Sequence, residues 1–172
     1  MEAPVSRGPM KSLMTWLDSE GIGYELHEHD RSLTAMATAR AEGVDPTTFE
    51  KVVWGRSVDD GDALIVLDAD DHLDLSKASA VLRSGKVKLV PEEELTELAP
   101  DCDPGAMPAV GSLFGLPTYA DLHVCDSAEV SFNAGSHTVA VRVDRADWER
   151  ALGVIYADLA AATWREPGWH RS

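Results

Sequence analysis

The most constraining stretch of the sequence is a pair of apolar runs joined by a short acidic turn. The first run extends from Phe49 to Gly55 and the second from Ala63 to Asp68, with Asp59-Asp60-Gly61-Asp62 between them. Residues that favour strands dominate both runs, and an Asp-Gly pair is a strong hairpin signal. Because the runs are continuously apolar, we expect this hairpin to lie at the centre of the sheet.

Helix and strand signals are mixed along the rest of the chain, without a regular alternation of the two. Helical spacing of apolar residues, with caps or glycines at the ends, predicts helices over residues 12–20, 34–41, 73–82, 91–95 and 146–161. Shorter runs predict strands over residues 24–29, 87–90, 117–121, 129–132 and 138–143. We therefore expect an α/β fold of the mixed α+β type, a single compact domain in which helices surround a curved, mostly antiparallel or mixed sheet.

The two ends of the chain differ in composition from its middle. Residues 1–9 are polar and interrupted by Pro4, Gly8 and Pro9, so we expect a disordered leader, then a domain over residues 10–162 and a tail over residues 163–172. The apolar runs are too short to cross a bilayer, and the start of the chain lacks the apolar core of a signal peptide. These features predict a cytoplasmic protein without membrane contact, in which Cys102 and Cys125 are free thiols.

The charge limits the partners that this chain can bind. A formal net charge of −15 and a pI near 4.6 exclude a protein that coats nucleic acid through many phosphate contacts. A small local contact remains compatible with this charge. Four basic residues either form one positive patch or belong to a solvated face of mixed charge, which is the commoner case: Lys77, Arg83, Lys86 and Lys88.

Two glycine-containing turns between Pro104 and His137 mark the candidate site. In the first, glycines stand among prolines, so backbone amides can point into open space and hold an anion or a carbonyl oxygen. The second turn, Asn133-Ala134-Gly135-Ser136, lies between two predicted strands and places His137 at the start of the second strand. The alternative is that both segments are ordinary hairpin connections.

The sequence gives weaker signals for other functional residues. Lys51 stands on an apolar strand, where it either extends from an edge to solvent or enters a pocket that holds a partner for its charge. The pairs His27/His29 and His123/Cys125 have no established zinc spacing, so we expect no metal. The sequence contains no G-x-S-x-G elbow, P-loop or dinucleotide fingerprint.

Several of these motifs together resemble the YbaK and prolyl-tRNA-synthetase-associated domain family, over roughly residues 12–160. They are Phe49-Glu50-Lys51-Val52-Val53, Asp74-Leu75-Ser76-Lys77, Lys88-Leu89-Val90-Pro91-Glu92-Glu93, Gly105-Ala106-Met107-Pro108 and Phe132-Asn133-Ala134-Gly135-Ser136-His137. The resemblance implies a mixed α/β domain that hydrolyses the ester of mischarged aminoacyl-tRNA without a metal or cofactor. Because the chain carries no synthetase domains, it resembles the free-standing, trans-acting members.

The resemblance also assigns site residues. The family's lysine falls on Lys51, and its loop of Gly, three residues and Pro begins at Gly105; here Ala109 stands where the motif ends in proline, directly after Pro108. A histidine after the Gly-Ser turn, typical of the alanine-editing branch, matches His137. The implied catalytic residues are Lys51, Gly105, Ala106, Met107 and His137, and the implied substrate-binding residues are Pro108, Gly135 and Ser136.

The expected function is that of a trans-acting aminoacyl-tRNA deacylase. The resemblance implies a small amino acid, of the Ala-tRNA(Pro) type, that is released by substrate-assisted attack of water. The implied partners are the 3′ end of aminoacyl-tRNA and a prolyl-tRNA synthetase. A non-catalytic module that binds a tRNA end or an amino acid, and a hydrolase of another small acyl ester, are the alternatives. The amino acid, the tRNA, the need for a synthetase and the oligomeric state stay open.

Overall fold

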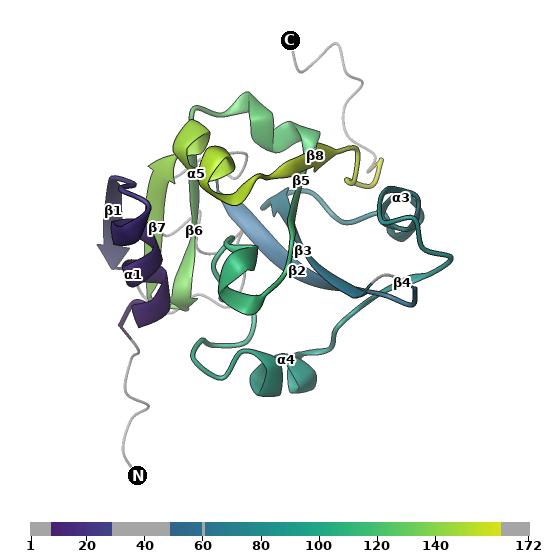
Figure 1. Ribbon diagram of the computed structural model, residues 1–172, viewed down its shortest axis with the longest axis horizontal. Coiled ribbons are helices and arrows are strands. Elements are labelled where there is room, and N and C mark those ends of the chain that lie inside the picture. The colour runs from purple at the N-terminus through teal and green to yellow at the C-terminus, as the bar shows by residue number, and fades with distance from the viewer. Residues whose placement is uncertain (1–7, 29–48, 60, 163–172) are drawn as a thin grey trace.

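A computed structural model describes residues 8–28, 49–59 and 61–162 of the chain, and its strands form two sheets (Figure 1). In the three-stranded sheet, β7 (Val139–Asp144) lies between β1 (Tyr24–Glu28) and β6 (Glu129–Ser136), and all pairs are antiparallel. The five-stranded sheet has the order β4 (Val87–Leu89), β2 (Glu50–Ser57), β3 (Gly61–Asp68), β5 (Thr118–Asp121) and β8 (Ile155–Ala157). It is antiparallel from β4 to β3 and parallel from β3 to β8.

The main core lies between the two sheets and is closed by helices. It joins Trp54 and Val66 of the five-stranded sheet to Phe132 and Val141 of the three-stranded sheet. Helix α1 (Lys11–Ser19) adds its buried leucines, and α5 (Arg145–Leu152) adds Trp148. A parallel bridge between Phe49 and Ser131 connects the start of β2 to β6.

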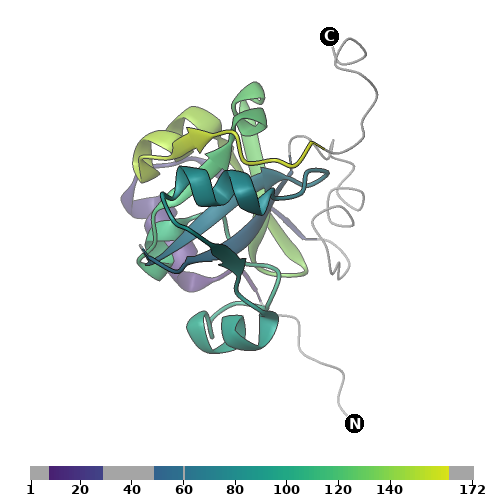
Figure 2. The same cartoon turned by 90° about the vertical axis from the view of Figure 1, so that its right-hand side faces the viewer.

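The other face of the five-stranded sheet carries a second core under α3 (Leu75–Val81). Figure 2 shows this helix lying across the sheet. Ile65 and Leu67 pack there against Ala78, and Leu159 comes from the segment after β8. Because successive residues of β3 point into different cores, both faces of β2 and β3 are covered, which explains their unbroken apolar character. The prediction of a central hairpin is confirmed.

Most predicted elements are present. The strand at residues 24–29 is β1, the helices at 12–20 and 73–82 are α1 and α3, and the helix after Pro91 is α4 (Glu92–Leu98). Two short 3-10 helices were not predicted, η1 (Gly111–Phe114) and η2 (Leu122–Asp126). The predicted helix at 34–41, residues 1–7 of the leader and the tail at 163–172 lie outside the described residues.

The predicted last helix was wrong in its length. It was expected to reach residue 161, but α5 ends at Leu152 and β8 follows. Gly153 adopts a left-handed conformation with φ of 62°, and the amide of Val154 bonds back to the carbonyl of Glu149. This is the usual glycine stop of a helix. Leu159 is buried, but an extended segment carries it into the core.

The predicted turn at residues 133–136 was also misplaced. Strand β6 continues to Ser136, and the turn consists of His137 and Thr138. The pairing with β7 jumps from Asn133–Ala140 to Ser136–Val139, so Ala134 and Gly135 form a bulge. In the described part of the chain, no helix has the length and apolar character needed to span a membrane.

Candidate functional site

The bulge of β6 and the Gly105 segment are bonded to each other through their backbones. The amide of Gly135 donates to the carbonyl of Ala106 at 3.0 Å, and the amide of Asp103 donates to the carbonyl of Gly135 at 2.8 Å. Gly135 has a φ of 87°, and an added Cβ would lie 2.8 Å from the Cβ of Met10. Glycine is therefore required at this bulge for both conformation and space. The two glycine segments singled out from the sequence are adjacent.

His137 turns its ring onto the first of these segments. The side chain is buried, with 4% of the residue exposed, and an added Cβ on Gly105 would lie 3.6 Å from its Cε1. Nε2 lies 2.8 Å from the carbonyl oxygen of Pro104, so Nε2 carries a proton and donates it. In the neutral ring Nδ1 is then an acceptor, and this buried atom meets no donor among the described residues. His137 is thus not a turn residue that faces solvent.

The Gly105 loop is held from several sides. The amide of Ala106 donates to the carbonyl of Asp103 at 3.0 Å, so this amide serves the turn itself. Ala106, Met107 and Pro108 are buried, whereas Gly105 is exposed and has a φ of 80°. The indole of Trp148 donates to the carbonyl of Ala109 at 2.7 Å. This bond holds the backbone of Ala109, which stands where the family's loop motif has a proline.

Ser136 contributes to the turn rather than to an open surface. Its hydroxyl lies 2.9 Å from that of Thr138, and the amide of Thr138 donates to the Ser136 hydroxyl at 3.1 Å. The residue is almost fully buried. Within the described residues, the Ser136 side chain therefore orders the turn that carries His137.

Lys51 lies on β2, two residues after Phe49, which bridges to Ser131 of β6. It is half-buried and stands opposite Leu67 in the register of β2 and β3. Burial lowers the pKa of the Lys51 ammonium, while the nearby charges of Asp71 and Asp70 act in the opposite direction. A central strand and acidic neighbours favour the pocket interpretation over extension from a sheet edge. No described contact joins Lys51 to His137 or Gly105.

Asn133 is a polar residue that the sequence analysis did not single out. It is buried, and its side-chain oxygen meets no donor among the described residues. Asn133 and Lys51 each lie two residues beyond the parallel bridge of Phe49 and Ser131, in the same chain direction. The sequence pattern did not mark it, because the predicted strand ends at residue 132 and Asn133 was expected in the turn that follows.

Two buried carboxyl groups face each other at the start of the β2–β3 hairpin. Glu50 and Asp68 are directly opposite in the register, and 1% and 3% of these residues are exposed. Burial, together with the charges of Asp68, Asp71 and Asp70, holds the pKa of Glu50 well above its usual range. Burial and the same two following aspartates raise the pKa of Asp68 to about 7.

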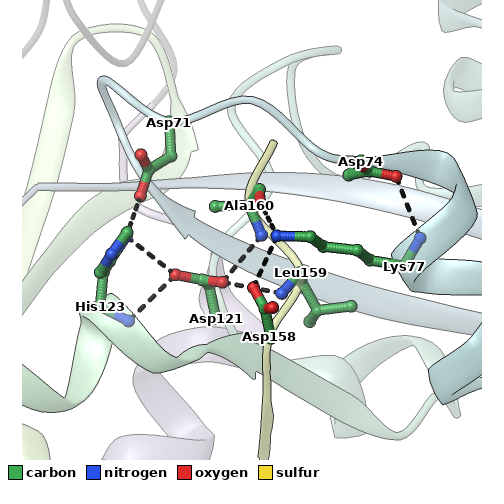
Figure 3. A network of polar contacts seen from close by, with 8 residues as sticks. All are labelled: Asp71, Asp74, Lys77, Asp121, His123, Asp158, Leu159 and Ala160. Carbon is green, nitrogen blue, oxygen red and sulfur yellow. Dashed lines mark hydrogen bonds and ion pairs between the residues drawn. The ribbon is translucent and has the colours of Figure 1, made fainter. Parts of the chain in front are cut away.

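A polar network joins nearby Asp71 to the segment after β8 (Figure 3). The Nδ1 of His123 lies 2.8 Å from Asp71 and 3.1 Å from Asp121. Asp121 also accepts from the amides of Leu159 and Ala160, both at 2.8 Å. This network was missed because His123 was considered only with Cys125, whose neighbours are Arg145 and Tyr156. Its signal in the sequence is a set of aspartates directly after the strands.

Lys77 belongs to the same region. Its ammonium donates to Asp158 at 2.9 Å and to the carbonyl of Ala160 at 2.8 Å (Figure 3). This ion pair favours the mixed-charge interpretation for Lys77 over membership of a positive patch.

Two cavities in the described part of the chain lie outside the candidate residues. One, of about 460 Å³, is lined by residues 8–12 with Pro100 and Asp101. The other, of about 390 Å³, lies near the β2–β3 turn and is lined by residues that include Ser57, Tyr119 and Ile155. The first is the nearer to the candidate site, because Met10 in its wall bonds to Ala134 of the bulge.

Comparison with known proteins places these features in a family. A model of the aminoacyl-tRNA editing domain matches residues 29–151. No curated protein matches the chain at a significant level.

Three solved structures show the same fold. A protein provisionally described as a trans-editing enzyme for prolyl-tRNA synthetase is 24% identical, with a TM-score of 0.78 over 91% of this chain and 100% of its own. A protein described only as hypothetical is 18% identical, with a TM-score of 0.80 over 88% and 100%. A protein from work on grafting epitope backbones onto scaffolds is 21% identical, with a TM-score of 0.77 over 90% and 97%.

Proposed function

Because the chain belongs to the aminoacyl-tRNA editing domain family, we propose that it is a trans-acting deacylase that hydrolyses the ester between a tRNA and a wrongly attached amino acid. The observation that carries this proposal is the position of the His137 ring on the Gly105 loop, where its Nε2 lies 2.8 Å from the carbonyl oxygen of Pro104. His137 and Gly105 are 32 positions apart in the sequence, and both match family motifs. We take residues 10–162 as the editing domain.

The chemistry fits a site of this kind. An aminoacyl ester is already activated, so its hydrolysis depends on a positioned water and on stabilisation of the developing oxyanion. In the proposed mechanism the exposed Gly105 brings its backbone close to the ester carbonyl. The hydroxyl next to the ester on the terminal adenosine orients the water. No side chain then has to act as a strong general base.

His137 is proposed to hold the substrate. Its buried Nδ1 is an acceptor that meets no donor among the described residues, and the α-ammonium of an aminoacyl group is a strong donor. The bond from Nε2 to Pro104 fixes the ring orientation, so Nδ1 keeps one direction. Buried Ala106 and Met107 are proposed as walls that leave room only for a small amino acid such as alanine.

Lys51 is proposed to contact the terminal phosphate or ribose, or to hold the ester. A lysine whose pKa is lowered by burial is less strongly hydrated than one at the surface, which favours a direct contact with substrate. Because only the 3′ end of the tRNA enters the site, an acidic protein can bind this substrate through a few local contacts. We propose tRNA(Pro) as the tRNA, a prolyl-tRNA synthetase as the partner and the cytoplasm as the location.

The test compares substrates that differ only in their tRNA part. The full chain is incubated with Ala-tRNA(Pro), with Pro-tRNA(Pro) and with a small alkyl ester of alanine, and the released amino acid is measured. We expect release from Ala-tRNA(Pro) alone. Binding of the charged tRNA without release would indicate a non-catalytic module, and equal turnover of the alkyl ester would indicate a general ester hydrolase.

A further inference from the structure

A second group of polar side chains, most of them buried, lies at the carboxyl ends of the parallel strands. Asp68 ends β3, Asp121 ends β5 and Asp158 follows β8. Because β3, β5 and β8 run in parallel, these residues meet at one edge of the five-stranded sheet. In open α/β sheets this is the edge at which ligands bind. None of the residues at this edge takes part in the proposed ester hydrolysis.

Three side chains here have the geometry of metal ligands. Asp68, Asp71 and His123 each offer one ligand atom, and these atoms lie within 4.8 Å of one another. The amide of Asp71 donates to the carbonyl of Asp68 at 2.9 Å, so a tight turn fixes the two carboxylates. Nδ1 of His123 and the carboxylate of Asp71 are 2.8 Å apart. If an ion binds two ligand atoms at about 2.1 Å each and at a right angle, these two atoms are about 3 Å apart. The separation between His123 and Asp71 is close to this value.

Glu50 supplies an independent observation. It is 1% exposed, and neither of its carboxyl oxygens meets a donor among the described residues; the same holds for Oδ1 of Asp68, directly opposite. Two carboxyl groups can bond to each other only if one of them carries a proton. A buried carboxylate without a donor or a cation is costly. Glu50 is therefore a fourth oxygen ligand, placed opposite Asp68 of the group of three, and its carboxyl oxygens meet no cationic donor among the described residues.

We propose that Glu50, Asp68, Asp71 and His123 bind a divalent cation of the Mn²⁺ or Zn²⁺ class. Carboxylates suit both ions, and the imidazole favours them over Mg²⁺ and Ca²⁺, which prefer oxygen ligands alone. Asp121 then acts as a support, because it accepts from the backbone amide of His123 and from the amides of Leu159 and Ala160.

The consequence of such an ion is structural. It would join the start of β2, the end of β3 and the beginning of η2, three segments that meet only through tertiary contacts. Its binding free energy would add to the stability of the fold. The site is separate from the contact of His137 with Gly105, so the proposal does not depend on the proposed deacylase activity.

The test measures binding of Mn²⁺ to the full chain after treatment with a chelator. The free ion is followed by electron paramagnetic resonance, Zn²⁺ is used as a competitor, and unfolding is followed by circular dichroism. We expect one Mn²⁺ per chain, displacement by Zn²⁺ and a rise in Tm of about 5 °C at saturation. Asp71→Asn and Glu50→Gln should each weaken binding at least about 10-fold.

The variants are chosen so that a failure to fold does not obscure the result. Asp68→Asn removes a ligand but also removes repulsion from Glu50, so this variant should fold and should bind Mn²⁺ at least about 10-fold more weakly. His72→Gln and Cys125→Ser are the matched controls, because His72 is exposed next to Asp71 and Cys125 lies two residues from His123. No binding at millimolar ion, or equal binding by wild type and a folded Asp68→Asn, would overturn the proposal.

Discussion

Replacement of Asp68 by asparagine should stabilise the metal-free protein at neutral and alkaline pH. In the folded chain burial, together with the charges of Asp71 and Asp70, raises the pKa of Asp68 to about 7, while Glu50 and His123 act in the opposite direction. A carboxyl group whose folded pKa lies above its unfolded pKa binds more protons in the folded state. Stability is therefore lost as the pH rises from the unfolded value of 3.8 toward the folded value, and the loss is complete above it.

The size of the effect follows from the pKa. A rise from 3.8 to about 7 corresponds to about 4 kcal/mol at about 1.4 kcal/mol for each pKa step. Water that reaches the ionised Asp68 and relaxation of the groups around it reduce this free energy. We therefore expect Asp68→Asn to raise the free energy of unfolding by about 2 kcal/mol at pH ~8, with little change at pH ~4. For a chain of this size that is a Tm increase of about 4 to 8 °C.

The assay is thermal unfolding in the presence of a chelator at several pH values between these two. Asp18→Asn is the matched control, because Asp18 is exposed on α1 and should change Tm little at any pH. A Tm gain for Asp68→Asn that does not grow with pH would refute the argument that ionisation of this residue is unfavourable. A loss of stability at pH ~8 would show that groups around the Asp68 carboxylate stabilise it by more than burial, Asp71 and Asp70 destabilise it.

Four further results are expected. Lys51→Ala should reduce deacylation at least about 100-fold while the far-ultraviolet spectrum stays unchanged, since the half-buried lysine contributes little to either core; an unfolded variant would show that Lys51 is structural. His137→Ala should change the relative rates on one tRNA charged with alanine, serine, cysteine or proline, because discrimination between small side chains is only about 1–3 kcal/mol; an equal fall on all four would assign His137 to chemistry or tRNA contact. Trp148→Phe removes the bond to Ala109 and should cost about 1–3 kcal/mol of stability, measured by urea unfolding; an unchanged midpoint would mean that the loop does not depend on it. Dialysis against a chelator should leave turnover intact, and a loss that Zn²⁺ restores would contradict a metal-free reaction.

The central hairpin could be predicted because its signal is local. Residues of β2 and β3 point alternately into two cores, which makes both runs apolar, and the turn residues lie between them. The last helix was predicted too long because its apolar spacing continues past Leu152. Gly153 in the left-handed conformation outweighs that spacing, and the following residues reach the second core from β8 and the segment after it.

The candidate site was predictable only where chemistry coincides with a motif. Gly105 and His137 were predicted together, and the structure places the His137 ring on the Gly105 loop, bonded to the carbonyl of Pro104. The bulge that causes this contact is not visible in the sequence, because it depends on bonds from Gly135 to Asp103 and Ala106 across the fold. The group around Asp68 was missed for the same reason: Asp71 and His123 are 52 residues apart and meet only when β3 and β5 pair.

The two polar sites share one physical feature, and this feature indicates that each of them binds a ligand. The fold leaves Nδ1 of His137 and the carboxyl oxygens of Glu50 buried without a partner among the described residues, although each such atom costs stability. Groups of this kind persist when a ligand completes them. The missing partners differ: the imidazole nitrogen of His137 needs a donor, which an aminoacyl ammonium supplies, whereas Glu50 opposite Asp68 needs a positive charge or a proton. The same fold therefore supports two distinct ligands, one at the β6 bulge and one at the ends of β3 and β5, and a variant at one site should leave binding at the other unchanged.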